Sequence, residues 1–186
     1  GFPIIVLPNS QILICGNFSM YNTSPRNSLA RLNADGSLDN TFNPAGPSPT
    51  GVTMAQLPDG RLLVTGNFTT YDGVARGSVA LASSNGVLDP SFSPVGSPGT
   101  VWSCFVLSDG TAILGGLYNP IPPGFTQYNG TTVNGIARIW LTTPVSLASS
   151  SPQRNTNNNA LSTPLNLNFT QSMNAVTASQ SAFRVW

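Results

Sequence analysis

The sequence contains no histidine, and charged residues make up only 7% of its 186 positions. Lysine and glutamate are also absent, so every cation is an arginine and every anion an aspartate. Without histidine or lysine there can be no Ser-His-Asp or Cys-His nucleophile, no histidine-ligated metal, no Schiff base and no phosphate-loop lysine. We therefore expect no catalytic residue, cofactor or metal. A net charge of +1 without clustered cations argues against nucleic acid as a partner.

Long hydrophobic runs are missing as well, which predicts that no segment inserts into a membrane. The sequence opens without methionine or a signal-peptide pattern, so we expect a processed product or a fragment. Hydrophobic residues still make up 40% of the chain, whereas disordered chains combine low hydrophobicity with high charge. The composition predicts a folded domain whose surface is polar and nearly uncharged.

A repeat of 50 residues is the strongest pattern. Residues 7–18 (LPNSQILICGNF), 57–68 (LPDGRLLVTGNF) and 107–118 (LSDGTAILGGLY) align, and the first two copies continue without a gap to 36–44 and 86–94. The third copy has about seven extra residues around 119–127, which we expect to form an exposed loop because of three prolines. It rejoins the pattern at Tyr128 and stops after Trp140.

Each repeat predicts antiparallel strands. Residues 51–57 and 61–68 flank Asp59-Gly60, typical of a hairpin with a two-residue loop, and 78–83 predict a third strand. Residues 87–92 predict either a short fourth strand or a closing loop. Three or four strands per repeat are typical of a propeller blade, so the fold class is all-β, with about three antiparallel propeller-type blades over 1–50, 51–100 and 101–145.

The repeat LPDG-x5-GNFTTY, followed by DGSLDxTFNP, resembles the delta-60 repeat, a β-propeller-type repeat known mainly from large secreted or surface bacterial proteins. The resemblance covers residues 1–140, with two good copies and one partial copy that lacks the closing LDxxF. It implies blades and extracellular display, and it supplies no catalytic residues.

Three blades form an incomplete propeller with open strand edges. Residues 146–160, rich in Ser and Asn, predict a linker or long loop, and 161–186 an extended β segment. Alternation there predicts two strands, whose apolar positions are Leu165, Leu167, Phe169, Phe183, Val185 and Trp186. These strands could complete the chain's own last blade or insert into a neighbouring subunit.

The remaining candidates have structural alternatives. The aspartates of the turns and closing loops are expected to accept hydrogen bonds from nearby backbone N–H groups. Cys15 and Cys104 are expected to be buried free thiols. In the expected register, Cys15 lies opposite Ile4 and Cys104 lies opposite Gly115. N-glycosylation sequons occur as often as chance predicts in so Asn-rich a chain, at Asn17, Asn22, Asn67, Asn129 and Asn168. Repeat aromatics such as Trp102 either pack between blades or form a sugar-binding face.

Three function classes remain, and an enzyme is the least expected of them because the sequence lacks bases with a pKa near neutral pH. The sequence favours a non-enzymatic extracellular structural protein, a subunit of a self-assembling fibre or surface layer, glycosylated if its sequons are used. Protomers would exchange strands and form a homo-oligomer or homopolymer. The alternative is a carbohydrate-binding or adhesive propeller module.

Overall fold

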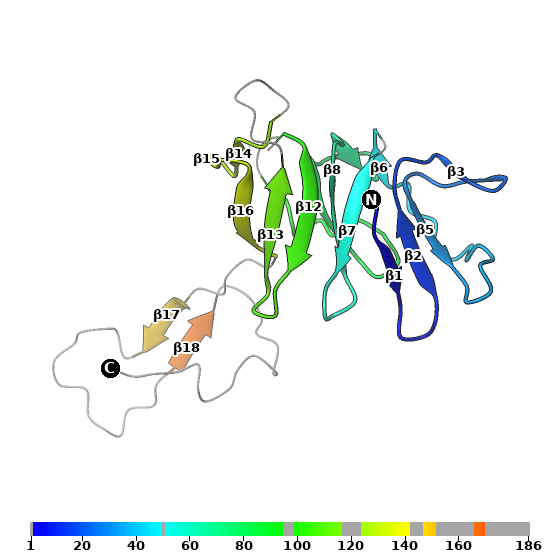
Figure 1. The fold of residues 1–186 in the computed structure, drawn as a ribbon. Helices are drawn as coiled ribbons and strands as arrows, with labels where there is room; N and C mark the ends of the chain where they lie inside the picture. Colours follow the sequence, from blue (N-terminus) through cyan, green and yellow to red (C-terminus); the bar gives the residue numbers. More distant parts are fainter. Residues whose placement is uncertain are drawn as a thin grey trace. The chain divides into compact units, whose positions relative to one another are not determined.

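The computed structural model describes residues 2–49, 51–94, 99–116, 124–141, 147–151 and 166–169, the last two segments by their backbone alone. Within these residues every regular element is a β-strand (Figure 1). The chain divides into two units, Gly1–Thr142 and Thr143–Trp186. None of the described segments is a helix that could cross a membrane.

The first unit contains three antiparallel three-stranded sheets, which we call blades. Blade 1 has the order β1 (Ile4–Val6), β2 (Ile12–Cys15), β5 (Leu29–Leu32). Blade 2 has the order β7 (Val52–Gln56), β8 (Leu62–Gly66), β11 (Val79–Ala82). Blade 3 has the order β12 (Val101–Val106), β13 (Thr111–Gly116), β16 (Ile136–Trp140). The predicted all-β fold with propeller-type blades is confirmed, and the propeller is not closed.

The turn that joins the first two strands of each blade has three residues, not the expected two. In blade 2, Gly60 N–H donates to the Leu57 carbonyl at 2.9 Å, and Leu57 N–H donates to the Arg61 carbonyl at 2.8 Å. Gly60 has φ +88, which a residue with a Cβ rarely adopts. This extra turn residue moves the pairing by one position.

The shifted register changes the partners of both cysteines. Cys104 pairs with Leu114 rather than with Gly115, and Ile4 pairs with Ile14 rather than with Cys15. The register prediction was therefore wrong by one residue, because it assumed a two-residue loop at each turn.

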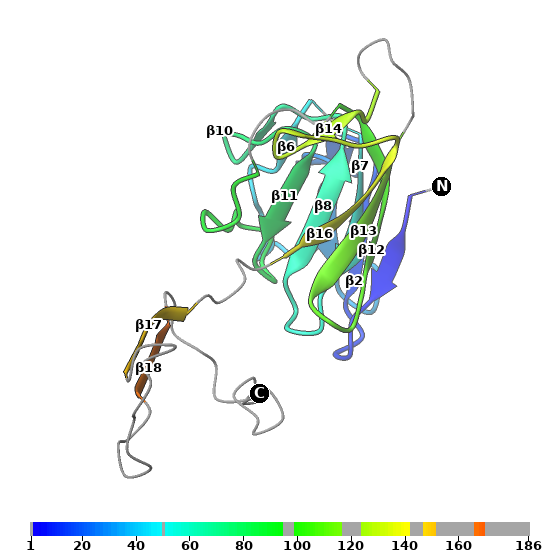
Figure 2. The same ribbon diagram turned by 90° about the vertical axis from the view of Figure 1, so that its left-hand side faces the viewer.

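Short hairpins lie at the opposite end of the sheets from these turns (Figures 1 and 2). They consist of β3 (Met20–Tyr21) with β4 (Ser24–Pro25), β9 (Thr70–Tyr71) with β10 (Val74–Ala75), and β14 (Gln127–Tyr128) with β15 (Thr131–Thr132). Strand β6 (Pro47–Ser48) pairs with β9. Each hairpin turns through two residues, and the first of them has a positive φ, at Asn22, Asp72 and Asn129.

The closing segments of blades 1 and 2 are loops rather than fourth strands. Each makes one isolated bridge to its blade, Leu32 with Leu38 and Ala82 with Leu88. These equivalent bridges are 50 residues apart, as are the paired positions of strands β2 and β8. The predicted gap-free correspondence of repeats 1 and 2 is confirmed.

The extra segment of the third repeat is only partly described. Phe125 is fully buried in the core and Gln127 begins β14, so the expectation of an exposed loop over 119–127 was wrong at its end. The Phe125 side chain packs in the same hydrophobic cluster as Leu114, and a Cβ on Gly116 would lie 2.6 Å from the Cβ of Phe125. Residues 119–123 lie outside the described part of the chain.

Two hydrophobic clusters lie between neighbouring blades. Leu13, Leu29 and Phe42 of repeat 1 pack against one face of blade 2. Leu63, Val79 and Leu81, on the other face of blade 2, pack with blade 3 residues such as Leu114 and Ile139. The run Leu62–Val64 is therefore fully buried on both faces, and continuous apolar runs are typical of such strands.

The second unit contains one antiparallel pair, β17 (Leu147–Ser151) with β18 (Asn166–Phe169). Strand β18 contains Leu167, Phe169 and the sequon Asn168, where a strand was predicted. Strand β17 lies within 146–160, where the sequence predicted a linker, because ladder bonds are made by the backbone and need no apolar side chains. The other tail candidates, Leu165, Phe183, Val185 and Trp186, lie outside the described residues.

Candidate functional site

The aspartates have the structural role that the sequence predicted. In the turns, Asp35, Asp59 and Asp109 each accept a hydrogen bond from the backbone N–H two residues later, at 2.9 to 3.1 Å. In the closing loops, Asp39 and Asp89 accept the same bond from Thr41 and Ser91, at 2.9 Å each. These carboxylates stabilise turns and are not grouped for acid-base chemistry.

Asp72 holds two loops instead of one. Its carboxylate accepts the N–H of Gly46 at 2.7 Å and that of Leu88 at 2.9 Å. Asp72 therefore joins the segment between blades 1 and 2 to the closing loop of repeat 2.

Among the described residues, no three Cys, Asp or Glu side chains are close enough together to hold a metal ion.

Arg31 makes the most extensive polar contacts between blades. Its Nε donates to Asp39 at 2.7 Å, with both side chains about nine-tenths buried. Its NH1 reaches blade 2, donating to the Ser84 carbonyl and to Asn85 Oδ1, both at 3.2 Å. The guanidinium also lies 5.1 Å from the centre of the Phe42 ring. The Thr41 hydroxyl, which donates at 2.6 Å, and the Arg31 guanidinium hold the pKa of Asp39 well below its usual range.

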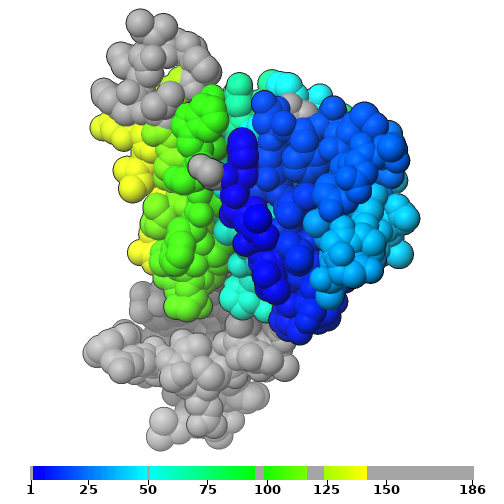
Figure 3. Space-filling model, turned by 45° about the vertical axis from the view of Figure 1, so that its right-hand side comes forward, coloured from blue at the N-terminus to red at the C-terminus, as the bar shows by residue number. Residues whose placement is uncertain are grey.

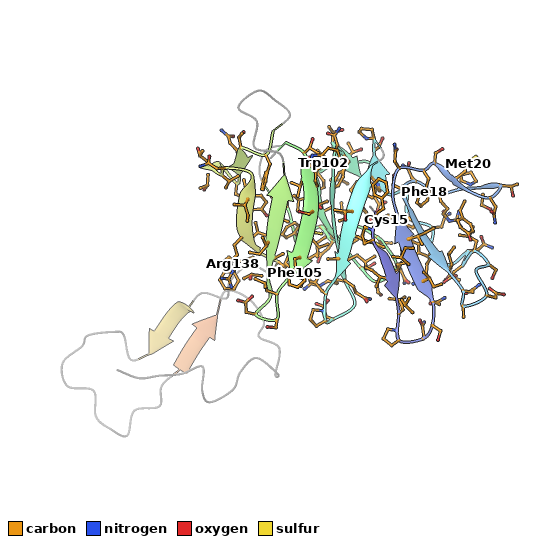
Figure 4. All side chains as sticks on the ribbon, in the orientation of Figure 1. Cys15, Phe18, Met20, Trp102, Phe105 and Arg138 are labelled. Atoms are coloured by element: carbon orange, nitrogen blue, oxygen red, sulfur yellow. The ribbon has the colours of Figure 1, made fainter. Side chains whose placement is uncertain are left out.

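Arg138 is the equivalent residue of repeat 3, and it lies at the surface. Its NH2 donates to Asp109, and its Nε to the Thr111 hydroxyl at 3.1 Å. About half of each side chain in the Arg138–Asp109 pair is exposed. Arg138 therefore pairs with the turn aspartate of its own repeat, whereas Arg31 pairs with the closing-loop aspartate, which has no equivalent in repeat 3. Figure 4 labels Arg138, which belongs to β16.

The cysteines are free thiols, as predicted. Burial raises the pKa of Cys15 to about 12 and that of Cys104 to about 11. Cys15 belongs to the cluster between blades 1 and 2, and Cys104 packs against the cluster between blades 2 and 3. Thiols this weakly acidic are poor nucleophiles at neutral pH, which argues against cysteine chemistry.

Four of the five sequon asparagines can be placed with their side chains, and all four are exposed: Asn17, Asn22, Asn67 and Asn129. Asn22 and Asn129 lie at equivalent hairpin tips, where φ is 52 and 48. Asn67 Oδ1 accepts a hydrogen bond from the Thr100 hydroxyl at 3.3 Å. Both side chains are exposed, so a glycan at either hairpin tip would extend into solvent.

The outer faces of blades 1 and 3 expose apolar side chains. In the strands of blade 1, Ile4 is 69% and Val6 70% exposed. Figure 3 shows the N-terminal segment, in dark blue, at the surface. In blade 3, Phe105 is 66%, Ile136 63% and Trp140 58% exposed. The equivalents of Ile4 and Ile136 in blade 2 are Met54 and Val79, which are buried against neighbouring blades, so the aligned repeats could have indicated these two positions.

A cavity of about 310 Å³ lies where the first strands of the three blades meet. Phe2 and Trp102 line it, both about half exposed, together with Gly51, Thr53 and Gly66. Two aromatic residues beside a partly apolar cavity suit a flat apolar ligand face.

Comparison with known proteins finds one family. A domain of unknown function described as a β-propeller (DUF5122) matches residues 7–42 and 57–92. These are the first two repeats, so the chain carries β-propeller-type repeats. No curated protein and no solved structure matches the chain.

Proposed function

We propose that this protein is a non-enzymatic structural subunit that works outside the cell and assembles with copies of itself into a fibre or surface layer. The single observation that carries the proposal is the open blade array, whose first and last blades expose large apolar side chains such as Ile4 and Trp140. Exposed apolar faces of this kind are typical of protein interfaces. The free thiols, the aspartates that stabilise turns and the lack of histidine in the sequence support a role without catalysis.

The repeats are, in this proposal, of the delta-60 type, which agrees with the family match over both complete copies. Extracellular display follows from that resemblance. It is supported by the exposed sequons, of which Asn22 and Asn129 occupy hairpin tips. We propose that these sites carry glycans, which would keep a surface with few charges soluble.

Exchange of tail strands would connect the subunits. A strand from residues 161–186 would pair with an open strand edge of a neighbour and bury apolar side chains there. The candidate side chains are those of Leu165, Leu167, Phe169, Phe183, Val185 and Trp186. Contacts of this heterologous kind repeat from copy to copy, and they give filaments unless the rotation closes a ring.

The test compares the full chain with a truncation that ends at Ser150. Light scattering and negative-stain electron microscopy of the full chain should show an assembly. The truncation should keep the far-ultraviolet circular dichroism of folded β-sheet and fail to assemble. A truncation that assembles normally would refute strand donation, and a full chain that stays monomeric would refute the structural role. Intact mass before and after a glycosidase tests the glycans.

A carbohydrate-binding module is the second candidate, favoured by the cavity between Phe2 and Trp102. Isothermal titration calorimetry with soluble glycans would test it. The Trp102→Ala variant is the matched control, since binding at this cavity should disappear with the ring. Binding that survives in the variant would place the sugar elsewhere.

A further inference from the structure

Blade 1 carries a face that has the same residue pattern as a buried face of blade 2. In blade 2, this face presents Met54, Leu62 and Val64 to blade 1, and their exposed fractions are 3%, 0% and 0%. The equivalent residues of blade 1, 50 positions earlier, are Ile4, Ile12 and Ile14. Ile4 is 69% exposed, and the two others are half-buried. We call this surface of blade 1 the N-terminal face.

The aromatic residues beside this face show the same contrast. Phe68 and Tyr71 are fully buried in the cluster between blades 1 and 2. Their equivalents in repeat 1, Phe18 and Tyr21, are half-buried (Figure 4 labels Phe18). The N-terminal face therefore lacks the cover that blade 1 gives to blade 2.

Blade 3 carries the opposite kind of face. Leu63 and Val79, which blade 2 presents to blade 3, are fully buried. In blade 3 their equivalents are Ile113, half-buried, and Ile136, 63% exposed. Ladder pairing places Phe105, Ile113 and Arg138 side by side on this surface, which we call the C-terminal face.

The two faces carry opposite charges at one pair of equivalent positions, and Arg138, one of the two, also pairs with Asp109 of its own repeat. Within the chain, Arg31 crosses from blade 1 to the turn of blade 2, where it binds the Ser84 carbonyl and Asn85 Oδ1. The equivalent of Arg31 on the C-terminal face is Arg138. The equivalent of Asn85, in the turn beside the N-terminal face, is Asp35, an exposed carboxylate. A contact of the same geometry between copies would replace an Arg–amide bond by an Arg–carboxylate pair, which is stronger.

We propose that the C-terminal face of one copy docks onto the N-terminal face of the next copy, with Arg138 of the first reaching Asp35 of the second. The contact continues the stacking of blade on blade already present twice within the chain, and it rests on the self-association proposed above. Two copies joined at both faces bring six of the described blades together, and six is within the range of closed propellers. If the rotation does not close, the same contact makes a filament.

Trp140 adapts the C-terminal face to this role. Repeats 1 and 2 close with a phenylalanine, Phe42 and Phe92, and the third repeat has no such LDxxF motif. Repeat 3 instead has Trp140 where repeats 1 and 2 have Asn33 and Ser83. The 58% exposed indole supplies apolar surface on the face that lacks the closing phenylalanine.

The test is cross-linking between two single-cysteine additions. Arg138→Cys and Asp35→Cys chains are mixed, allowed to assemble, and treated with a bismaleimide whose short spacer matches an arginine side chain. The matched control mixes Arg138→Cys with Asn85→Cys, because Asn85 is the equivalent of Asp35 and already lies against Arg31 of its own chain. We expect a covalent dimer in the first mixture, at least tenfold more than in the control or in either variant alone.

The outcomes separate this inference from the proposed function. An assembly that gives no more dimer than the control would overturn the docking and leave self-assembly standing, whereas a monomeric protein would overturn both. The Trp140→Asp variant should lose assembly while its circular dichroism is unchanged, and normal assembly of this variant would contradict the docking. If truncation at Ser150 abolishes both assembly and cross-linking, strand donation replaces the face-to-face contact.

Discussion

Blade 2 and blade 3 are built from the same repeat, yet one is covered on both faces and the other on one. Leu63 and Val79 of blade 2 are fully buried, whereas the equivalent Ile136 of blade 3 is mostly exposed. The difference does not come from the strands, which pair in the same order. It comes from the neighbours, so burial in this fold belongs to the interface between repeats rather than to the repeat alone.

Removing an apolar side chain from the middle blade should have the largest effect. Leu63→Ala leaves a cavity in the cluster between blades 2 and 3, and we expect a loss of about 3 kcal/mol in the free energy of unfolding. Ile113→Ala, at the equivalent position of blade 3, removes a half-buried side chain and should cost about 1 kcal/mol. Urea denaturation of both variants measures the difference. Equal losses would mean that the C-terminal face is covered in the protein as purified.

Alanine substitutions at two equivalent glycines distinguish the cost of backbone strain from the cost of a packing clash. Gly36 and Gly86 both have a positive φ, +82 and +80, so alanine at either costs about 1 kcal/mol. A Cβ on Gly36 meets nothing within 4 Å, whereas one on Gly86 would lie 2.7 Å from the buried Phe42 ring and 2.8 Å from Pro44. We expect Gly86→Ala to lose about 2 kcal/mol more than Gly36→Ala in thermal or urea unfolding. A similar loss in both would show that the Phe42 ring moves aside.

The two arginine–aspartate pairs should respond differently to acid. The lowered pKa of Asp39 means that its contribution to stability is complete above the unfolded-state value near 4 and is lost as the pH falls below it. Asp39→Asn should lower the free energy of unfolding by about 2 kcal/mol at pH 7, because it leaves the buried Arg31 without its partner. The stability of this variant should also fall less between pH 7 and pH 3 than that of the original protein. Asp109→Asn, in an exposed pair, should change stability little at either pH. Unfolding curves between pH 7 and pH 3 compare the two variants. If both lose the same stability on acidification, the role of burial is contradicted.

The sequence predicted the repeating architecture well because apolar alternation and turn residues recur every 50 positions. Strands β7, β8 and β11 lie within the predicted ranges, and the continuous run Leu62–Val64 indicated a strand buried on both faces. The register was missed because Asp-Gly is compatible with both a two-residue and a three-residue loop. The bond from Gly60 N–H to the Leu57 carbonyl and the bond from Leu57 N–H to the Arg61 carbonyl distinguish the two.

The interaction surfaces could be predicted less well than the strands. Sequence alternation shows that Ile136 and Arg138 share a face, but not whether another element covers it. Phe125 lies next to a proline-rich insertion, and its burial depends on packing between blades 2 and 3, which the local sequence does not indicate. The equivalence of Arg31 and Arg138 was visible in the aligned repeats, but its meaning required the contact from Arg31 to Asn85.

The two native thiols allow the blade interfaces to be compared without any substitution. Cys15 reports on the interface of blades 1 and 2, and Cys104 on that of blades 2 and 3. Cys15 is buried with a pKa of about 12, and Cys104 is half-buried with a pKa of about 11. At pH 8 both should react with a thiol reagent far more slowly than in denaturant, since the thiolate is the nucleophile. Cys104 should react before Cys15, and mass spectrometry of digested samples can follow each site. Faster labelling of Cys15 would show that blade 1 separates from blade 2 more readily than blade 3 does.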